Sequence, residues 1–535
     1  MKLALPALLL CLSLLVSPAA HAASCDSLAQ LKLPQTTIVS AGTVAAGTFS
    51  PPEKQTDPRE AAVFAATPAF CRVIAEAKPS SDSDIKIEVW LPLSGWNGKY
   101  QGQGNGGFAG SLDYGGMARA VTAGYATSAT DTGHEASGID ARWALGHPEK
   151  IVDFAYRGLH EMTVQAKSVA QAFYGKAPKH SYFSSCSDGG REALMEAQRF
   201  PADYDGIVAG APANFWTHLL TAAVWDMQAL QKDPASYIPA SKVPAIGAAV
   251  IAACDRLDGV ADGVLNDPRQ CHFDPATILC KGADSDSCLT APQVTALKKI
   301  YAGPRNSQGE QILPSFSPGG EDGEGGWALW ITGAAPGKSL QFFFGNGFFT
   351  NMVFDDPKWD FRTLNFDGDV TLADKKEAAI LNSTDPNLKP FAARGGKLIL
   401  YHGWSDAAIP PVNTINYFEQ VIATMGRKET NSFVRLYMVP GLQHCGGGPG
   451  ANSFGQWGVL PPGNDPQHDV QSAVEQWVEK GIAPKEIIAT KHVSDFDPSS
   501  GVQMTRPLCP YPQLAKYKGK GDTNDASSFV CAAEK

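Results

Sequence analysis

One short segment, Ser184–Glu192, limits what this chain can fold into more than any other part of the sequence. Residues 181–184 before the turn predict a short strand, and residues 192–197 predict the helix that follows. A serine between small residues at a tight strand-to-helix turn has its hydroxyl exposed above a sheet, which is the geometry of a nucleophile elbow. Ser187 is therefore the first candidate nucleophile.

The segment matches the elbow pattern G-x-S-x-G only in part. Ser185 occupies the first glycine position and Gly189 the second. A small residue still suits a tight turn, but a serine-rich loop that caps a helix explains these residues equally well. The choice between the two interpretations depends on the rest of the chain.

Composition and charge describe a globular protein with room for two domains. The chain has 535 residues, of which 44% are hydrophobic and 18% charged, and its formal net charge is -10. These proportions are those of an ordinary folded protein. There is no basic block that could bind a phosphate backbone, so we do not expect a nucleic-acid partner.

Residues 1–22 have the pattern of a secretory signal peptide. A leucine-rich run follows Lys2, and the segment ends in a small-x-small cleavage site at Ala20 and Ala22. A lipoprotein anchor at Cys25 is the weaker alternative, because no leucine lies three positions before it. No later apolar run is long enough to span a bilayer. The sequence thus predicts a soluble, secreted or periplasmic protein without a membrane partner.

Strand-like and helix-like segments alternate between residues 86 and 212 and again from 397 to 439. This alternation predicts an α/β fold, with a mostly parallel sheet and helices on both of its faces. We expect residues 23–212 and 386–535 to form this domain together. The expected strands are 85–92, 125–130, 204–212, 397–403 and 434–439, and the expected helices are 114–123 and 153–174.

Residues 213–385 differ in character from the rest of the chain. They are irregular, contain many glycines and prolines, and hold two of the closely spaced cysteine pairs. We interpret them as an inserted second domain. Their aromatic clusters comprise Trp327, Trp330, Phe342, Phe343, Phe344, Phe348 and Phe349.

A serine hydroxyl needs a base and a carboxylate before it can act as a nucleophile at neutral pH. Asp406 lies just after the strand expected at 397–403, and His444 lies just after the strand expected at 434–439. Both positions are carboxyl ends of strands, where open sheets place their sites. The order serine, aspartate, histidine is that of sheet hydrolases. We predict that Ser187, Asp406 and His444 form a catalytic triad.

Each of the two partners is weak evidence when taken alone. An aspartate in a strand-end loop is commonly a turn residue, and a single histidine is more often structural than catalytic. His134 and His402 also lie near strand ends, and they could line the site without acting as the base. The order and the positions of all three residues together favour the triad.

Ten of the 11 cysteines lie beyond the leader, an even number that suits an oxidising compartment. Cys186 directly precedes the proposed nucleophile, and Cys445 directly follows the proposed base. A bridge between them would tie the two together; the alternative is that each pairs with Cys25 or Cys71. We prefer Cys186–Cys445, which leaves Cys25–Cys71. Short spacing favours the pairs Cys254–Cys271, Cys280–Cys288 and Cys509–Cys531.

The oxyanion of an acyl-transfer intermediate needs amide donors. The glycine-rich loop 96–110 follows an early strand and supplies candidates, and Asp188 supplies a second amide because it follows the nucleophile. A phosphate-binding loop is the alternative interpretation of residues 96–110. However, the segment lacks the lysine-serine ending of a P-loop and opens into no clear helix.

Residues 254–268 carry aspartates every three or four positions between glycines. Oxygen ligands from such a tight loop suit calcium. The spacing is not that of an EF-hand, and a solvated acidic turn is nearly as good an interpretation. A Cys254–Cys271 bridge would hold the loop in place, which favours a structural metal over a catalytic one.

The chain resembles the tannase and feruloyl esterase family, which includes bacterial enzymes that hydrolyse mono(2-hydroxyethyl) terephthalate. The hallmark of this family is a serine and a histidine that each adjoin a cysteine, with the two cysteines bridged. Cys186-Ser187, Asp406 and His444-Cys445 match this hallmark. The tail at 505–512 also resembles the C-terminal segment of the family, and the match covers nearly all of the mature chain.

This resemblance implies an α/β-hydrolase domain with a lid domain inserted after residue 212 and a calcium ion in that lid. It implies Gly107 and Asp188 as the oxyanion donors, and aromatic side chains of the lid as the wall for the acyl group. No organic cofactor is implied. The implied calcium ligands are the carboxylates of Asp255, Asp258 and Asp262 and the backbone carbonyls of Val260 and Val264.

The resemblance also implies a secreted serine esterase whose small-molecule substrates are esters of aromatic acids. An acyl group with a free carboxylate favours an arginine partner, yet residues 306–361 contain no arginine, only Lys338 and Lys358. We therefore expect neutral or phenolic esters, such as ferulates or gallates. The alternatives are a mono(2-hydroxyethyl) terephthalate hydrolase, a broad carboxylesterase, and a secreted protein that binds an aromatic ligand without turnover.

Overall fold

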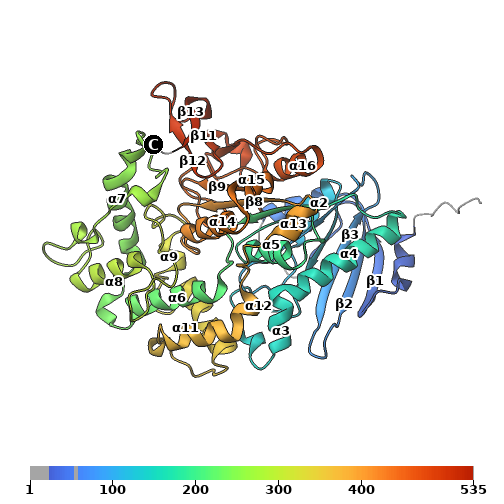
Figure 1. Cartoon of the computed structure of the whole chain (residues 1–535), viewed down its shortest axis with the longest axis horizontal. Coiled ribbons are helices and arrows are strands. Elements are labelled where there is room, and N and C mark those ends of the chain that lie inside the picture. The colour runs from blue at the N-terminus through green and yellow to red at the C-terminus, as the bar shows by residue number, and fades with distance from the viewer. Residues whose placement is uncertain (1–22, 53–57, 534–535) are drawn as a thin grey trace, which may run out of the picture.

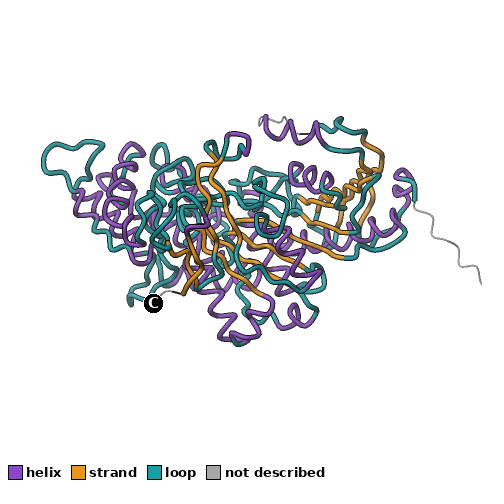
Figure 2. The backbone as a smooth tube through the Cα atoms, turned by 90° about the horizontal axis from the view of Figure 1, so that it is seen from above, coloured by secondary structure: helices purple, strands orange, loops and turns teal. Residues whose placement is uncertain are grey.

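A nine-stranded sheet forms the centre of the computed structural model, which describes residues 23–52 and 58–533 (Figure 1). The predicted leader, 1–22, lies outside the described residues. Figure 2 shows the strands in the interior, with helices and loops around them. In sheet order the strands are β1 (Thr36–Val44), β2 (Phe70–Ala77), β3 (Ile85–Pro92), β5 (Ala126–Thr130), β4 (Lys99–Gly102), β6 (His180–Cys186), β7 (Gly206–Gly210), β8 (Lys397–Gly403) and β9 (Val434–Val439).

The sheet is mostly parallel, as expected, but it carries an antiparallel part at one end. The run β5-β4-β6-β7-β8-β9 is parallel, whereas β1, β2, β3 and β5 pair antiparallel. The sequence analysis missed β1, β2 and β4, and it assigned the residues of β4 to the glycine-rich loop 96–110. In β1, an edge strand, none of the side chains is fully buried, so its sequence has no strong apolar pattern.

Helices cover both faces of the sheet and bury its apolar residues between them. Side chains of α4, α5 and α14 pack on one face, and side chains of α2 and α16 pack on the other. The helices of this part of the chain are α1 (Pro58–Ala66), α2 (Tyr114–Thr122), α3 (Pro148–Val152), α4 (Gly158–Tyr174), α5 (Asp188–Arg199), α13 (Lys389–Ala393), α14 (Pro411–Met425), α15 (Arg427–Phe433) and α16 (Val470–Lys480).

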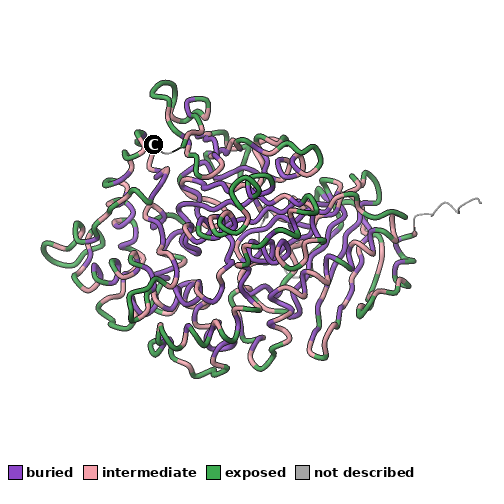
Figure 3. The backbone as a smooth tube through the Cα atoms, viewed as in Figure 1, coloured by how far each residue is buried: buried purple, intermediate pink, exposed green. Residues whose placement is uncertain are grey.

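The central parallel strands are buried along almost their whole length, as Figure 3 shows for the interior of the molecule. Such burial on both faces explains their continuous apolar sequences. The carboxyl ends of parallel strands meet at one edge of a sheet. The loops after β6, β8 and β9, which carry Ser187, Asp406 and His444, are therefore brought to the same edge.

The chain between β7 and β8 contributes no strand to the nine-stranded sheet and forms a second lobe of helices and loops (Figure 1). We call residues 213–385 the lid. Its apolar side chains make separate clusters around α6 and around α8. The helices of the lid are α6 (Trp216–Gln231), α7 (Val243–Cys254), α8 (Ala291–Ala302), α9 (Trp327–Trp330), α10 (Leu340–Phe348), α11 (Gly368–Ala373) and α12 (Ala379–Leu381).

One described segment of the lid, Pro234–Asp258, is apolar and long enough to cross a membrane by length and composition alone. The expectation that no later run has this property is therefore wrong. The regular helix within the segment, α7, has only 12 residues. Such a helix is about 18 Å long, whereas the apolar core of a bilayer is about 30 Å thick. In the fold, α7 buries Val243, Ile246 and Val250 against the lid.

After α16 the chain ends in two small antiparallel sheets that the sequence analysis did not predict. Their strands are short and their burial is uneven, so their sequences lack a clear period. The strands are β10 (Ile487–His492) with β11 (Val502–Leu508), and β12 (Gln513–Tyr517) with β13 (Phe529–Ala533).

Candidate active site

Ser187 lies at a sharp turn between β6 and α5. Its backbone has φ 67° and ψ -123°, a region that residues other than glycine rarely adopt. The turn is held from both sides, because the Ser187 amide donates to the Gly210 carbonyl (3.0 Å) and its carbonyl accepts from the Ala213 amide (3.1 Å). This is the strand-turn-helix geometry of a nucleophile elbow.

The structure explains why Ser185 can replace the first glycine of the elbow pattern. A β-carbon at Gly189 would lie 1.9 Å from Ser185 Oγ, and one at Gly104 would lie 2.6 Å from it. The Ser185 side chain therefore occupies space that is open only because two glycines face it. The match was incomplete in sequence because this compensation depends in part on Gly104, which lies 81 positions before Ser185 in the chain.

The structure brings Ser187, His444 and Asp406 together. Ser187 Oγ lies 2.9 Å from His444 Nε2, and His444 Nδ1 lies 2.8 Å from Asp406 Oδ2. With its proton on Nδ1, the imidazole donates to the carboxylate and can accept the serine proton on Nε2. Trp330 of the lid packs edge-on against the His444 ring, with 4.9 Å between ring centres.

Asp406 is fully buried, and four groups satisfy its carboxylate. Oδ1 accepts the amides of Ala408 (2.7 Å) and Ile409 (2.9 Å), and Oδ2 contacts His444 and, at 3.2 Å, His402 Nε2. Burial acts to raise the pKa of Asp406, but the two histidines and their hydrogen bonds outweigh it and hold the pKa below its ordinary value. The carboxylate therefore stays ionised beside the imidazole.

The two competing histidines do not contact Ser187 in this arrangement. His402 is fully buried, and its Nδ1 lies 2.7 Å from Thr414 Oγ1. His134 Nε2 lies 2.8 Å from the Phe108 carbonyl, and burial lowers its pKa to about 4. Each histidine thus supports a loop of the site, His402 the Asp406 loop and His134 the glycine-rich loop.

Cys186 and Cys445 form a disulfide, with 5.9 Å between their α-carbons. It joins residues 259 positions apart, directly beside Ser187 and His444. Cys445 also has a positive φ, 61°, so the bridge links two strained turns. The other four disulfides of the structure are Cys25–Cys71, Cys254–Cys271, Cys280–Cys288 and Cys509–Cys531.

Two backbone amides near Ser187 have no hydrogen-bond acceptor among the described residues, namely those of Gly107 and Asp188. Both residues line the same cavity as Ser187. Asp188 is the first residue of α5, where a helix leaves its amides unsatisfied and carries a partial positive charge. The pair can therefore bind an oxygen that becomes negatively charged next to Ser187.

A buried carboxyl group that the sequence analysis missed supports this loop. Glu192, on the first turns of α5, accepts the Asn105 amide on Oε2 at 2.9 Å. Burial, and after it the nearby charge of Asp188, raise the pKa of Glu192 to about 8 against the opposing effects of Arg191 and the Asn105 amide. Glu192 thus connects the nucleophile helix to the glycine-rich loop.

A narrow cavity of about 80 Å³ opens at Ser187. Its wall is largely apolar, and among the described residues Asp188 is its only charged one. The sheet loops supply Gly107, Ser187, Asp188, Ala408 and Ile409, and the lid supplies Ala213, Trp216, Leu219, Leu220, Ala222, Ala223, Phe316, Trp330, Gln341 and Phe344.

Of the aromatic clusters noted in the sequence, only Trp330 and Phe344 line this cavity. Phe348 and Phe349 are instead fully buried in the lid core. Sequence analysis missed Trp216, although Trp216, Leu219, Leu220 and Ala223 recur at the spacing of one helix face. The pattern was visible, but nothing in it indicated which structure that face would contact.

The aspartates of residues 254–268 fold back onto their own loop. Asp255 accepts the Gly263 amide (2.8 Å), Asp258 accepts the Val260 amide (2.9 Å), and Asp262 accepts the Val264 amide (3.2 Å). Burial raises the pKa of Asp258 to about 6, and the nearby charges of Asp262 and Asp255 add to this effect. Arg506, which the sequence analysis did not consider, donates to Asp262 Oδ2 at 2.6 Å.

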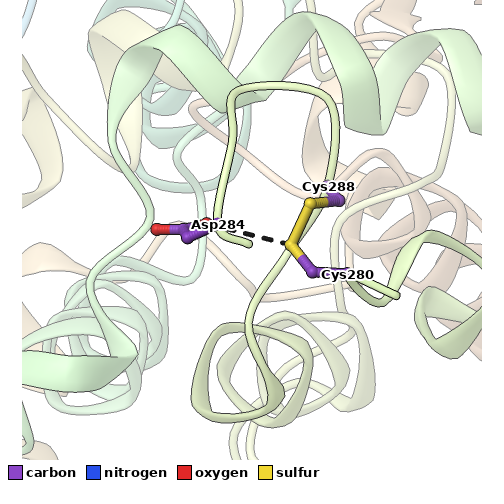
Figure 4. A group of neighbouring side chains, drawn as sticks. All are labelled: Cys280, Asp284 and Cys288. Carbon is purple, nitrogen blue, oxygen red and sulfur yellow. Dashed lines mark hydrogen bonds between the residues drawn. A yellow bond between two sulfur atoms is a disulfide. The ribbon is translucent and has the colours of Figure 1, made fainter. Parts of the chain in front are cut away.

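A second group of possible metal ligands, Cys280, Asp284 and Cys288, is shown in Figure 4. Its two sulfur atoms are bonded to each other, so neither is a thiolate that could bind a metal. Asp284 forms an ion pair with Lys242. This group is a disulfide-closed loop and has no free ligand set.

The raised pKa of Glu192 predicts a pH effect on stability. Glu192 binds its proton more tightly in the folded state than in the unfolded state, so its protonation stabilises the folded protein. This contribution is lost as pH rises from the ordinary pKa of the group, about 4.5, to its folded pKa, about 8. Glu192→Gln keeps an acceptor for Asn105 but does not ionise. We expect the melting temperature of the wild-type protein to fall relative to that of Glu192→Gln across this window.

Melting curves of both proteins between pH 5 and 8.5 test this expectation. Glu135→Gln serves as the control for loss of one negative charge, because the Glu135 side chain is 72% exposed. If the melting temperatures of wild type and Glu192→Gln change in parallel with pH, Glu192 does not have a raised pKa in the folded protein.

Comparison with known proteins agrees with this geometry. The chain matches the family model described as tannase and feruloyl esterase over residues 71–532. It is 45% identical to an uncharacterized esterase of Xanthomonas campestris pv. campestris, with 97% of this chain and 92% of that protein covered. It is 34% identical to the mono(2-hydroxyethyl) terephthalate hydrolase of Piscinibacter sakaiensis, with 88% and 86% covered.

Among solved structures, feruloyl esterase B from Aspergillus oryzae matches with a TM-score of 0.85 at 30% identity, and 95% of this chain and 99% of that chain are covered. The expected α/β-hydrolase fold is thereby confirmed. The chain belongs to the tannase and feruloyl esterase family, and it is a carboxylic ester hydrolase.

Proposed function

We propose that this protein is a secreted serine esterase that hydrolyses neutral or phenolic esters of aromatic acids through an acyl-enzyme on Ser187. One observation carries the proposal: Ser187 Oγ is 2.9 Å from His444 Nε2, and Ser187 lines a cavity together with Gly107 and Asp188, whose amides have no acceptor among the described residues. Nucleophile, base and oxyanion donors are then within reach of one ester group.

In the acylation step, Ser187 Oγ attacks the ester carbonyl carbon while its proton moves to His444 Nε2. The carbonyl electron pair moves to oxygen, and the amides of Gly107 and Asp188 donate to this oxyanion. When the intermediate collapses, the bond to the alcohol breaks and His444 returns its proton to the leaving oxygen. In deacylation, water attacks the acyl carbon while its proton moves to His444 Nε2, and the second intermediate then collapses to release the acid and return the proton to Ser187 Oγ. Asp406 stabilises the imidazolium in both halves of the reaction.

The cavity supports an uncharged acyl group. Neither Lys338 nor Lys358 lines it, and the charged residue that does, Asp188, forms an ion pair with the buried Arg191 (2.5 Å). Trp216, Phe316 and Phe344 supply flat apolar surface for a ring. One relative is a mono(2-hydroxyethyl) terephthalate hydrolase, but a terephthalate monoester brings a carboxylate, which favours a basic partner.

Secretion is supported by two independent features. Residues 1–22 have the pattern of a leader, and the ten cysteines beyond it form five disulfides. Disulfides at this density are typical of oxidising compartments.

Rates on methyl ferulate, methyl gallate and mono(2-hydroxyethyl) terephthalate, measured side by side with Ser187→Ala as the blank, test the function. We expect Ser187-dependent turnover, fastest on one of the two phenolic esters, and a loss in kcat of roughly 10⁴-fold or more in the variant, because nucleophile and base act as a unit. Efficient hydrolysis of the terephthalate monoester would overturn the substrate assignment. The absence of Ser187-dependent turnover would overturn the esterase mechanism.

We further propose that the acidic loop of the lid binds a structural calcium ion through Asp255, Asp258 and Asp262 and the carbonyls of Val260 and Val264. The chemistry of the donors is suitable, because three carboxylates on one short loop suit a hard cation, and burial together with the neighbouring negative charges raises the pKa of Asp258 and of Asp262. The Cys254–Cys271 disulfide closes the loop. When bound, the ion would offset this repulsion and hold the lid loop, without a part in the ester chemistry.

Removal of calcium should therefore destabilise the lid. At a free calcium concentration 100 times its Kd, binding stabilises the folded state by about 2.7 kcal/mol, so a chelator should lower the melting temperature and added calcium should restore it. Asp258→Asn should abolish this response, whereas Asp284→Asn, in the disulfide-closed loop, should keep it. A melting temperature that does not depend on calcium would contradict the site.

Removal of the Cys186–Cys445 bridge should lower the catalytic rate, in addition to the loss of stability expected when a loop of 259 residues is opened. Cys186→Ala with Cys445→Ala releases the backbone on both sides of the Ser187–His444 contact, and small displacements of reacting groups cost up to about 100-fold in rate. We expect kcat to fall roughly 10- to 100-fold with little change in KM. The control is the double variant Cys25→Ala with Cys71→Ala, because that bridge joins η1 (Cys25–Gln30) to β2. Its loss should lower the melting temperature but leave kcat unchanged. Equal kcat in both double variants would count against this role.

A further inference from the structure

An ion pair that the proposed mechanism does not use lies at the start of α5, directly after the nucleophile. Arg191 Nε donates to Asp188 Oδ1 at 2.5 Å, and the two side chains are 0% and 1% exposed. Transfer of both charges out of water is costly, so a buried ion pair is weak evidence for stability. Because Asp188 follows Ser187 in the chain, the pair calls for a reason connected with the reaction.

Arg191 is held in place by backbone carbonyls and by two aromatic rings. Its Nη1 donates to the Ala155 carbonyl at 2.7 Å and its Nη2 to the Phe154 carbonyl at 3.2 Å, both in the π-helical turn η3 (Asp153–Arg157). The guanidinium carbon lies 4.7 Å from the centre of the Phe154 ring and 5.3 Å from that of the Trp216 ring. Because Trp216 lines the cavity, the positive charge lies just behind the cavity wall.

The position of Asp188 makes its charge important for the reaction. Its backbone amide is one of the two proposed oxyanion donors, and the residue lines the cavity beside Ser187. Its carboxylate is, by covalent structure, close to that amide. A negative charge there repels an oxyanion, and the repulsion is strong in a site with little water. An unpaired Asp188 carboxylate would thus oppose the stabilisation that its own amide provides.

Among the described residues, Arg191 is the one cation that contacts this carboxylate. Asp188 Oδ2 is enclosed and has no hydrogen-bond partner in the described part of the chain. Burial raises the pKa of Glu192, the next residue of α5, to about 8, so this group is mainly uncharged at neutral pH. Burial also raises the pKa of Asp188, and Arg191 opposes this effect. The balance of charge beside the oxyanion site thus depends on Arg191.

We propose that Arg191 is a positioning residue for ester hydrolysis, which neutralises and orients the Asp188 carboxylate so that it does not oppose the oxyanion formed at Ser187. The guanidinium does not line the cavity, so it acts through Asp188 and not on the substrate. Repulsion is felt only once the carbonyl oxygen becomes charged, so its relief accelerates turnover and leaves substrate binding almost unchanged. This inference rests on the proposed function.

Two substitutions of Arg191 separate its charge from its packing. Arg191→Gln and Arg191→Lys both lose the planar fork that bonds two carbonyls, but only lysine keeps a positive charge. We expect kcat to fall roughly 10- to 100-fold in Arg191→Gln and to stay within about 5-fold of wild type in Arg191→Lys, with KM within about 3-fold in both. Rates are measured on whichever of methyl ferulate and methyl gallate the wild type hydrolyses faster. Division by the concentration of Ser187 that a fluorophosphonate labels excludes misfolded protein from the comparison.

Removal of the Asp188 charge should rescue this loss. Asp188→Asn keeps the backbone amide but removes the carboxylate, so in the Arg191→Gln background we expect kcat to recover by roughly 5-fold or more. If Arg191 only supported the fold, the opposite result would follow, because the second substitution removes a further contact. Arg191→Met, with and without Asp188→Asn, gives a second pair of variants if Arg191→Gln is poorly folded.

Arg157→Gln is the matched control. Arg157 belongs to the same π-helical turn, but its ion-pair partners are Asp153 and Glu149. Its substitution should lower the melting temperature and leave kcat unchanged.

The inference is overturned by any of three results: a wild-type kcat in Arg191→Gln, an equal loss in Arg191→Gln and Arg191→Lys, or no recovery with Asp188→Asn. If the wild type itself shows no Ser187-dependent turnover, the proposed function fails instead.

Discussion

The strained turn at Ser187 is the constraint on which the rest of the site depends. A positive φ at a residue with a side chain is unfavourable alone, so the surroundings must hold it. Here β7 accepts the Ser187 amide, two glycines leave room for Ser185, and the Cys186–Cys445 bridge fixes the turn to the strained backbone beside His444. The distance between nucleophile and base thus follows from the central strands and one covalent bond.

Buried carboxyl groups around this turn behave differently because their partners differ. Asp406 receives two amides and two histidines, which together outweigh burial and keep it ionised. Glu192 receives one amide and lies near Asp188, so burial dominates and its pKa rises. The ionisation of these buried carboxyl groups therefore depends on how many hydrogen bonds they accept and on the charge of their neighbours, and not on residue type alone.

The lid contacts the turn at Ser187 directly. Its first residue, Ala213, bonds the Ser187 carbonyl, and α6 then carries one apolar face along the cavity. Trp330, from a later part of the lid, packs against the His444 ring. The same insertion thus packs against His444, supplies most of the cavity wall and holds the acidic loop.

The sequence by itself indicated the nucleophile turn, the order of the three triad candidates, most of the parallel strands and the three closely spaced cysteine pairs, whereas the Cys186–Cys445 and Cys25–Cys71 pairs were a preference that the structure bears out. These features are local or lie at strand ends, where the period of apolar residues and the rule for parallel strands are sufficient. Only the tertiary structure decided that Glu192 supports Asn105, that Arg506 pairs with Asp262, and that Trp216 and Gln341 line the cavity. These contacts join segments that are distant in sequence, which no local pattern can reveal; for Trp216 and Gln341, the packing of α6 against α10 decides it.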